Sequence, residues 1–257
     1  MKLNFIILGS GSSLGVPSID GNFGDCDPKN SKNNRTRCSA LLSGRNFNLL
    51  IDSSPDVRQQ FLNNNVKSLD CVFYTHQHAD QTHGINDLRY FYLKNRKQIP
   101  VFANKETSKY LINSFKYCFK KTSKFYPPIM KLNNLKKKHN FLNNKIQISS
   151  FEVAHGSINS ICYVINKKLA YASDVNLINK KYYSKIRNLK FLVIDCLRLN
   201  PHPSHYNLDQ ILNLIKEIKP QNTILTNLHS SLDYEKLKKR LPKFVFPAYD
   251  GMKLIIN

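Results

Sequence analysis

Residues 75–80 read THQHAD and directly follow CVFY at 71–74, an apolar run that predicts a buried strand. Because side chains alternate along a strand, His76 and His78 are expected to point the same way, with Asp80 reaching from the loop that follows. Two imidazole nitrogens with a carboxylate oxygen suit Zn, Mn or Fe. Taken alone, the segment is equally compatible with a solvated polar turn after a strand.

Three more side chains that can bind metal each come just after an apolar, strand-like run; they are His155, Asp174 and His229. A single histidine at a strand end is usually a hydrogen-bonded loop residue. Several metal-binding side chains at the same place relative to their strands suggest a shared site. The apolar runs gather in two halves of the chain with helical segments between them, which predicts an α/β fold with two sheets packed face to face and helices outside.

With these motifs the chain resembles the metallo-β-lactamase superfamily, and more narrowly its phosphonate-operon cyclic phosphodiesterase and tRNase Z-like branch. The matching segments run from LGSG at residues 8–11 to PAYDGM at 247–252, so the resemblance spans nearly the whole chain. It implies a four-layer αββα metallo-β-lactamase sandwich. It also implies that residues 1–257 form a single metallo-hydrolase domain.

The resemblance further implies a centre of one or two divalent metal ions, Zn or Mn. His76, His78 and His155 would hold the first ion, Asp174 would bridge both, and Asp80 would bind the second. Two adjacent ions lower the pKa of a shared water and neutralise phosphate oxygens as charge builds in the transition state. Asp80 is therefore counted among the catalytic residues as well as among the ligands.

Two other residues match supporting positions of the family. Asp52, at the end of an apolar segment, resembles the aspartate that orients a metal ligand. His205 directly precedes the predicted helix 208–218 and resembles the histidine that protonates the leaving oxygen or steadies the phosphate. Its ordinary pKa near neutral pH suits general-acid catalysis. The alternative for His205 is a helix-cap or surface histidine.

The chain departs from the family pattern at two ligand positions, where it has Gln81 and Asn227 in place of histidine. A histidine stands two residues further on in each case, His83 and His229. Three outcomes are open: a second site rebuilt with His229, with or without His83; a weak site that prefers a harder ion such as Mn; or a single ion. We favour the first. For His83 itself we favour an exposed position at a helix start over ligation.

The formal net charge is +22, from 39 Lys and Arg against 17 Asp and Glu. Such a balance favours polyanionic partners such as RNA, nucleotides or phosphodiesters. The chain is also rich in Lys, Asn and Ile and has no Trp, a composition typical of AT-rich genomes, so charge alone does not identify a nucleic-acid-binding protein. We interpret the basic stretch 119–140 as a lysine-covered loop, and no segment matches the tRNA-gripping arm of tRNase Z.

The six cysteines form no CxxC pair, and Cys26 and Cys38 alone are too few for a structural zinc site. No disulfide framework is expected. The apolar start of the chain is too short for a signal peptide, and no run is long enough to cross a membrane. These features predict a cytoplasmic protein with no membrane partner.

The sequence therefore predicts a metal-dependent phosphoric diester hydrolase that acts on a cyclic phosphate or another small phosphodiester through metal-bound hydroxide. One alternative is tRNase Z-like processing of RNA 3′ ends. Another is a metal-poor, non-catalytic binding protein on the same fold, which Gln81 and Asn227 motivate. A thioester or lactam substrate also stays open, because the fold hosts several hydrolyses. RNA as a partner and a homodimer are left open.

Overall fold

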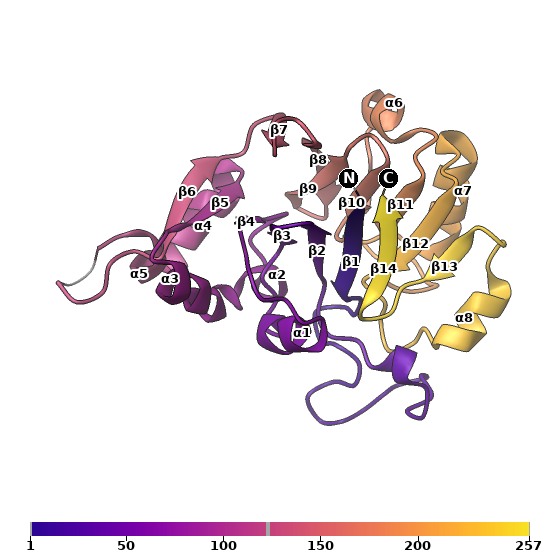
Figure 1. Cartoon of the computed structure of the whole chain (residues 1–257). Coiled ribbons are helices and arrows are strands. Elements are labelled where there is room, and N and C mark those ends of the chain that lie inside the picture. The colour runs from indigo at the N-terminus through magenta and orange to yellow at the C-terminus, as the bar shows by residue number, and fades with distance from the viewer. Residues whose placement is uncertain (1, 122–123, 257) are drawn as a thin grey trace. The chain divides into compact units, whose positions relative to one another are not determined.

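The computed structural model describes residues 2–121 and 124–256. The chain divides into two compact units, each built around its own seven-stranded sheet (Figure 1). Unit 1 comprises Met1–Gly9, Ser39–Leu135 and Gly251–Asn257, and unit 2 comprises Ser10–Cys38 and Lys136–Asp250. Among the described residues, no helix is both long enough and apolar enough to span a lipid bilayer.

The sheet of unit 1 has the strand order β14-β1-β2-β3-β4-β5-β6. Its strands are β1 (Leu3–Gly9), β2 (Ser39–Gly44), β3 (Phe47–Ile51), β4 (Cys71–Phe73), β5 (Ile99–Ala103), β6 (Met130–Asn134) and β14 (Met252–Ile256). Strands β3 to β6 run parallel to one another, whereas β1 pairs antiparallel with both β14 and β2. The carboxyl ends of the parallel strands therefore share one edge, which is where binding sites of such sheets collect.

Helices pack on one face of this sheet. They are α1 (Val57–Asn63), the 3₁₀ turn η2 (Ile85–Leu88), α3 (Arg89–Asn95), α4 (Lys105–Ser114) and α5 (Lys116–Phe119). The unit also contains the short helix α2 (Ala79–Thr82). Alternate residues of β5, namely Ile99, Val101 and Ala103, join Phe61 of α1 and Leu111 of α4 in one buried apolar cluster. The period of two along the strands thus selects the face that the helices cover.

The sheet of unit 2 has the order β13-β12-β11-β10-β9-β8-β7. Its strands are β7 (Lys138–Phe141), β8 (Ile146–His155), β9 (Ile158–Ile165), β10 (Leu169–Ala172), β11 (Phe191–Asp195), β12 (Asn222–Thr226) and β13 (Val245–Pro247). Strands β10 to β13 are parallel, and β7 to β10 are antiparallel. Here too the parallel strands bring their carboxyl ends to one edge.

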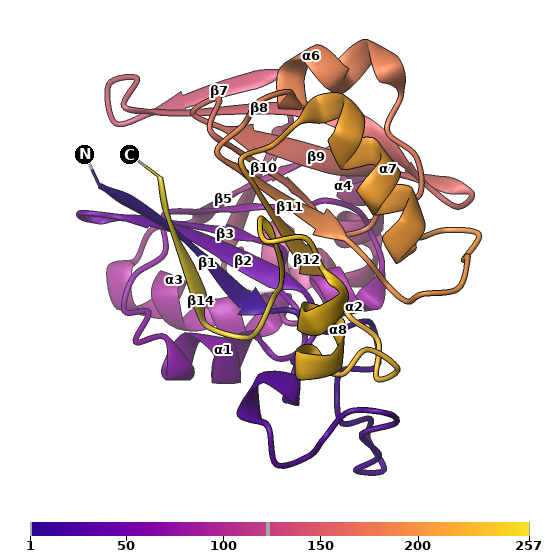
Figure 2. The same cartoon turned by 90° about the vertical axis from the view of Figure 1, so that its right-hand side faces the viewer.

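The helical elements of unit 2 are η1 (Ser31–Asn33), η3 (Lys180–Tyr182), α6 (Tyr183–Ile186), α7 (Leu208–Ile218) and α8 (Tyr234–Arg240). Helix α7 begins with a reciprocal capping box between Asn207 and Gln210. Its buried residues recur at helical spacing and pack, with α6, against one face of the sheet (Figure 2). This packing fixes the start of α7, where His205 lies.

The expected lysine-covered loop at 119–140 is a partial error. The described part of this stretch contains β6 and all but the last residue of β7, and each of these strands lies at one edge of its sheet; residues 122–123 lie outside the described residues. Edge strands often carry lysines, which discourage pairing with another chain. Because polar residues and lysines occupy β6 and β7, the sequence here lacks the alternation of apolar and polar residues that would have indicated strands.

One aspartate ties two loops of unit 2 together. Asp250 accepts hydrogen bonds from the backbone N–H of Ser10 (2.9 Å) and of Thr36 (2.7 Å), and from both hydroxyls (2.8 and 2.6 Å). We expect Asp250→Ala to lower the free energy of unfolding by about 3 kcal/mol, because it strips acceptors from donors that are largely shielded from water. Urea unfolding measures this change. Asp25→Ala, at an exposed position of the same unit, is the control, and equal midpoints for the two variants would contradict the prediction.

Candidate metal-binding residues

The motif of unit 1 is separated from the end of β4 by one residue. Thr75 and His76 are fully buried, whereas His78 is exposed and precedes α2 as its N-cap; Asp80 lies in the first turn of that helix. The ring nitrogens His76 Nε2 and His78 Nδ1 are 3.0 Å apart. The structure therefore turns the two imidazoles toward each other, as two ligands of one cation require.

Hydrogen bonds behind His76 fix its tautomer. Asp52, at the carboxyl end of β3, accepts from the Thr75 backbone N–H (2.7 Å) and from Thr75 Oγ1 (2.8 Å). Because that hydroxyl proton goes to the carboxylate, Thr75 Oγ1 accepts at 3.0 Å from His76 Nδ1–H. The lone pair of His76 then resides on Nε2, the atom that faces His78.

We expect Asp52→Ala to weaken metal binding about 10- to 100-fold, because partners behind a ligand hold its orientation and tautomer. Titration of the apoprotein with Zn²⁺ against a chromophoric chelator measures the affinity. Asp70→Ala is the matched control, because Asp70 is an exposed aspartate at the other end of β4. Unchanged affinity in Asp52→Ala, with a normal circular dichroism spectrum, would contradict this role.

Unit 2 brings three of the predicted residues together. His155 ends β8, Asp174 follows β10 and His205 precedes α7, and one ligand atom from each lies within 4.8 Å of the other two. His155 and Asp174 are buried, and the His205 side chain is 15% exposed. Two imidazoles and a carboxylate form a donor set that fits Zn or Mn.

A backbone carbonyl fixes the tautomer of His155, as the Thr75 hydroxyl fixes that of His76. His155 Nδ1 lies 2.7 Å from the carbonyl oxygen of Ser204. A carbonyl only accepts, so Nδ1 carries the proton and Nε2 has the lone pair that a metal requires. Gly156, at φ +59°, permits this approach, because an added Cβ would lie 2.8 Å from the Ser204 Cβ.

A buried carboxylate holds His205. Its Nδ1 donates to Asp195 Oδ2 at 2.6 Å, and the same oxygen accepts from the Val175 backbone N–H at 3.0 Å. Burial raises the pKa of Asp195 to about 7, although the hydrogen bond and charge of His205 oppose the shift. We missed Asp195 in the sequence, yet it ends an apolar strand, the same signal that identified Asp174.

Amide groups occupy the two positions at which the chain departs from the family. Asn227, buried at φ +61°, directs Nδ2 toward Asp174 Oδ1 and Asp195 Oδ1, both at 3.3 Å. In unit 1, Gln81 Nε2 donates to Asp80 Oδ2 at 3.2 Å. Each amide therefore acts as a hydrogen-bond donor to a neighbouring carboxylate within its own unit.

His229 and His83 are the histidines that stand two residues after the positions at which the chain departs from the family. His229 joins no group of three potential ligands in the described part of the chain. Its Nδ1 accepts from the Ser231 backbone N–H at 3.1 Å, and burial, followed by the charge of Arg198, lowers its pKa. This geometry gives no support to a second site rebuilt with His229. His83 is exposed, as expected, but lies at the C-cap of α2.

Residues 47–227 match the family model described as "Beta-lactamase superfamily domain". A crystal structure of a new diphosphatase from the PhnP family superimposes with a TM-score of 0.91 at 28% identity, covering 100% of this chain and 98% of the other. The crystal structure of human tRNase Z, short form, superimposes with a TM-score of 0.69 at 14% identity, covering 99% of this chain and 98% of the other. The structure of Zn²⁺-bound PqqB from Methylobacterium extorquens superimposes with a TM-score of 0.75 at 17% identity, covering 98% of this chain and 99% of the other.

One relative with a similar sequence is named as an acyltransferase. It is an octanoyltransferase of Porphyromonas gingivalis (strain ATCC BAA-308 / W83), 30% identical over 256 residues, which cover 98% of this chain and 51% of that protein. The chain thus spans about half the length of this relative.

Proposed function

Since the chain belongs to the β-lactamase superfamily, with the predicted α/β metallo-β-lactamase fold, we propose that it is a metal-dependent hydrolase that cleaves a P–O bond in a small phosphodiester or diphosphate. The observation that carries the proposal is the cluster of His155, Asp174 and His205 in unit 2. The cluster combines metal-binding donors with a histidine whose proton a buried carboxylate steadies. That combination suits hydrolysis of an ester with a poor leaving group.

We retain, as part of this proposal, the ligand assignment that the resemblance implies: His76, His78 and His155 for one ion, Asp80 for a second, and Asp174 shared by both. When bound, the metal would lower the pKa of a water molecule and offset the negative charge of the phosphate. His205 would donate its Nε2 proton to the departing oxygen. Asp195 would keep the His205 ring in place and favour its protonated form.

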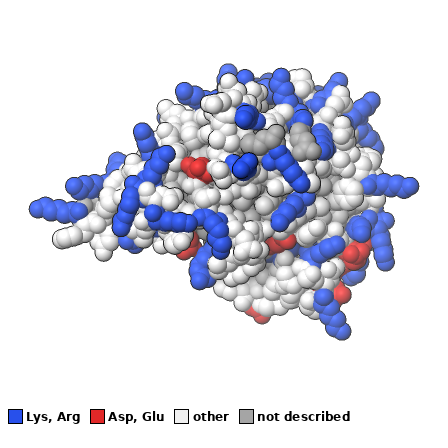
Figure 3. Space-filling view, viewed as in Figure 1, with Lys and Arg blue, Asp and Glu red and all other residues white. Residues whose placement is uncertain are grey.

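A phosphate-containing substrate agrees with the positive charge of the protein and with its similarity to the PhnP-family diphosphatase. Lysine and arginine side chains are spread over the visible face in Figure 3, with few acidic ones between them. Such a surface raises the local concentration of anions. The neighbour at 28% identity is a diphosphatase by name, which supports a small substrate over precursor tRNA.

A substrate panel tests this proposal. The protein, stripped with chelator and reloaded with Mn²⁺ or Zn²⁺, is assayed on bis(p-nitrophenyl) phosphate, a 2′,3′-cyclic nucleotide, a dinucleoside diphosphate and precursor tRNA. We expect turnover of at least one small substrate, lost in the apoprotein and restored by metal. Cleavage of precursor tRNA alone would favour RNA processing. Less than one bound metal per chain with no turnover would favour a non-catalytic binding protein.

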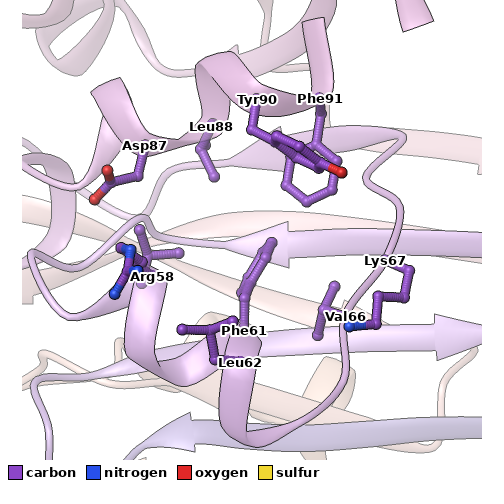
Figure 4. Close-up of a pocket in the computed structure, with 10 residues that line it drawn as sticks. Arg58, Phe61, Leu62, Val66, Lys67, Asp87, Leu88, Tyr90 and Phe91 are labelled. Carbon is purple, nitrogen blue, oxygen red and sulfur yellow. The ribbon is translucent and has the colours of Figure 1, made fainter. Parts of the chain in front are cut away.

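Thioester hydrolysis is a second candidate. Besides the name of the octanoyltransferase relative, unit 1 has an apolar cavity of about 390 Å³ between α1 and the η2–α3 segment. Figure 4 shows Phe61 of α1 projecting toward Tyr90 and Phe91 of α3. The cavity is large enough for a medium-length acyl chain, and hydrolysis of octanoyl-coenzyme A in the same panel would support this candidate.

Several other assignments stay predictions. They are the single-domain organisation, the cytoplasmic location, the choice between Zn and Mn, and a homodimer. Size-exclusion chromatography with light scattering would measure the oligomeric state, and metal analysis of protein purified without added metal would identify the ion.

A further inference from the structure

Two aromatic rings beside the metal motif of unit 1 lie nearly parallel to each other. His83 Nε2 and the Tyr110 hydroxyl are joined by a hydrogen bond of 2.9 Å, and the ring planes differ by 13° with centroids 6.5 Å apart. A hydrogen bond between the ring edges at this centroid distance places the rings end to end. The two rings therefore present nearly parallel faces next to each other, and we call this pair the His83–Tyr110 platform.

A third ring braces the platform. Phe115, which follows α4, stands nearly perpendicular to both rings, at 86° and 5.3 Å from His83 and at 77° and 6.4 Å from Tyr110. Perpendicular aromatic contacts are favourable and hold rings in place. His83 is nevertheless exposed, and Tyr110 is partly exposed. A rigid, flat aromatic surface at the protein surface is suited to binding another planar ring.

The platform adjoins a predicted ligand. Helix α2 spans Ala79–Thr82, with His83 as its C-cap, so His83 follows Asp80 by three residues. Side chains three apart on a helical turn lie on the same side, about 5–6 Å apart at Cβ. A group resting on the platform would therefore be attached, within a few bonds, to a phosphate held near Asp80.

We propose that the His83–Tyr110 platform stacks against the nucleobase of the substrate, so that the preferred substrates are nucleotidyl phosphodiesters or diphosphates. This inference rests on the proposed phosphate-ester hydrolase function. Stacking suits any base, because every base has a π-face. His83 Nε2 and the Tyr110 hydroxyl bond to each other, so these two groups do not read base edges. The platform consequently selects for a nucleobase with little preference among the four.

Two substrates that share the same five-membered cyclic phosphodiester, but differ in having a nucleobase, test the platform. A nucleoside 2′,3′-cyclic phosphate carries a base, whereas glycerol 1,2-cyclic phosphate does not. We expect His83→Ala to raise the KM for the nucleotide about tenfold, as loss of a stacking partner predicts, with kcat unchanged and glycerol cyclic phosphate unaffected. His83→Phe keeps a flat ring and should restore most of the affinity. An equal KM change for both substrates, or no change, would overturn the inference.

A matched control and a binding measurement separate this inference from the proposed function. His139 and Phe141 on β7 form another nearly parallel pair, at 17° and 6.4 Å, and His139→Ala should leave the nucleotide KM unchanged. Calorimetric titration with AMP needs no turnover, and we expect His83→Ala to bind it about tenfold more weakly than wild type. Should the wild type bind AMP through the platform but hydrolyse neither cyclic phosphate, the proposed reaction fails and the platform stands. Equal AMP binding by wild type and His83→Ala rejects the platform.

Discussion

Asp174→Asn is expected to lower kcat/KM on a small phosphodiester by at least about 10³-fold. A metal ion contributes several kcal/mol of charge stabilisation in the transition state, and each 1.36 kcal/mol is about tenfold in rate. Asp174 provides the carboxylate of the His155–Asp174–His205 cluster. The asparagine variant keeps the shape of the side chain but removes the negative charge, so both metal content and rate should fall.

The measurement pairs steady-state kinetics at saturating Mn²⁺ with metal analysis by mass spectrometry. Asp209→Asn is the matched control, because Asp209 is an exposed aspartate in the first turn of α7. Comparable melting temperatures would show that both variants are folded. If Asp174→Asn keeps its metal and more than a tenth of the wild-type rate, Asp174 is not a ligand and the assigned centre is wrong.

The sequence predicted the positions of the strand-end residues well, because their signal is local. A run of apolar residues that ends in His or Asp marks a carboxyl strand edge, and the structure has His155 and Asp174 at the carboxyl ends of β8 and β10. Helix α7 was predicted with its observed bounds, 208–218, since a capping residue and buried residues at helical spacing both mark it. The same local signal marks Asp195, but no motif of the family identifies this position as part of the site.

The orientations of the Asn227 and His229 side chains could not be predicted from the sequence, because they depend on three-dimensional contacts. Asn227 directs its amide toward both Asp174 and Asp195 because its backbone is left-handed, at φ +61°. These two partners lie 53 and 32 residues earlier in the sequence, so no local pattern indicates the contact. The expectation for His229 rested on its sequence distance from Asn227, whereas its ring nitrogen is engaged by the Ser231 backbone N–H. Spacing alone does not show which way a loop turns a side chain.

His205→Ala is expected to lower kcat about 10²- to 10⁴-fold on substrates with an alkoxide leaving group, the range typical of a lost general acid. The loss should be much smaller for bis(p-nitrophenyl) phosphate, because p-nitrophenolate departs without a proton. Metal content should stay at the wild-type level. Since His205 lies within reach of the ligand atoms of His155 and Asp174, loss of metal in this variant would instead make His205 a ligand.

The variant Asp195→Asn distinguishes a general-acid role of His205 from a purely structural role of the His205–Asp195 pair. The carboxylate stabilises the protonated imidazole of His205, so its removal lowers the His205 pKa. A general acid must be protonated, and the alkaline limb of the rate profile should therefore move to lower pH, by about one unit. A structural role for the pair would lower the rate at every pH and leave the limb in place.

The stability of Asp195→Asn gives an independent check on the burial of this carboxylate. Burial raises the pKa of Asp195 from 3.8 to about 7, so the folded state binds this proton more tightly than the unfolded state does. The resulting stability is fully present below pH 3.8 and is lost as the pH rises to about 7. The variant lacks this titration, and the unfolding free energy of wild type minus that of the variant should fall across the same window. A difference that grows with pH would mean that the His205 cation outweighs burial and holds the carboxylate ionised.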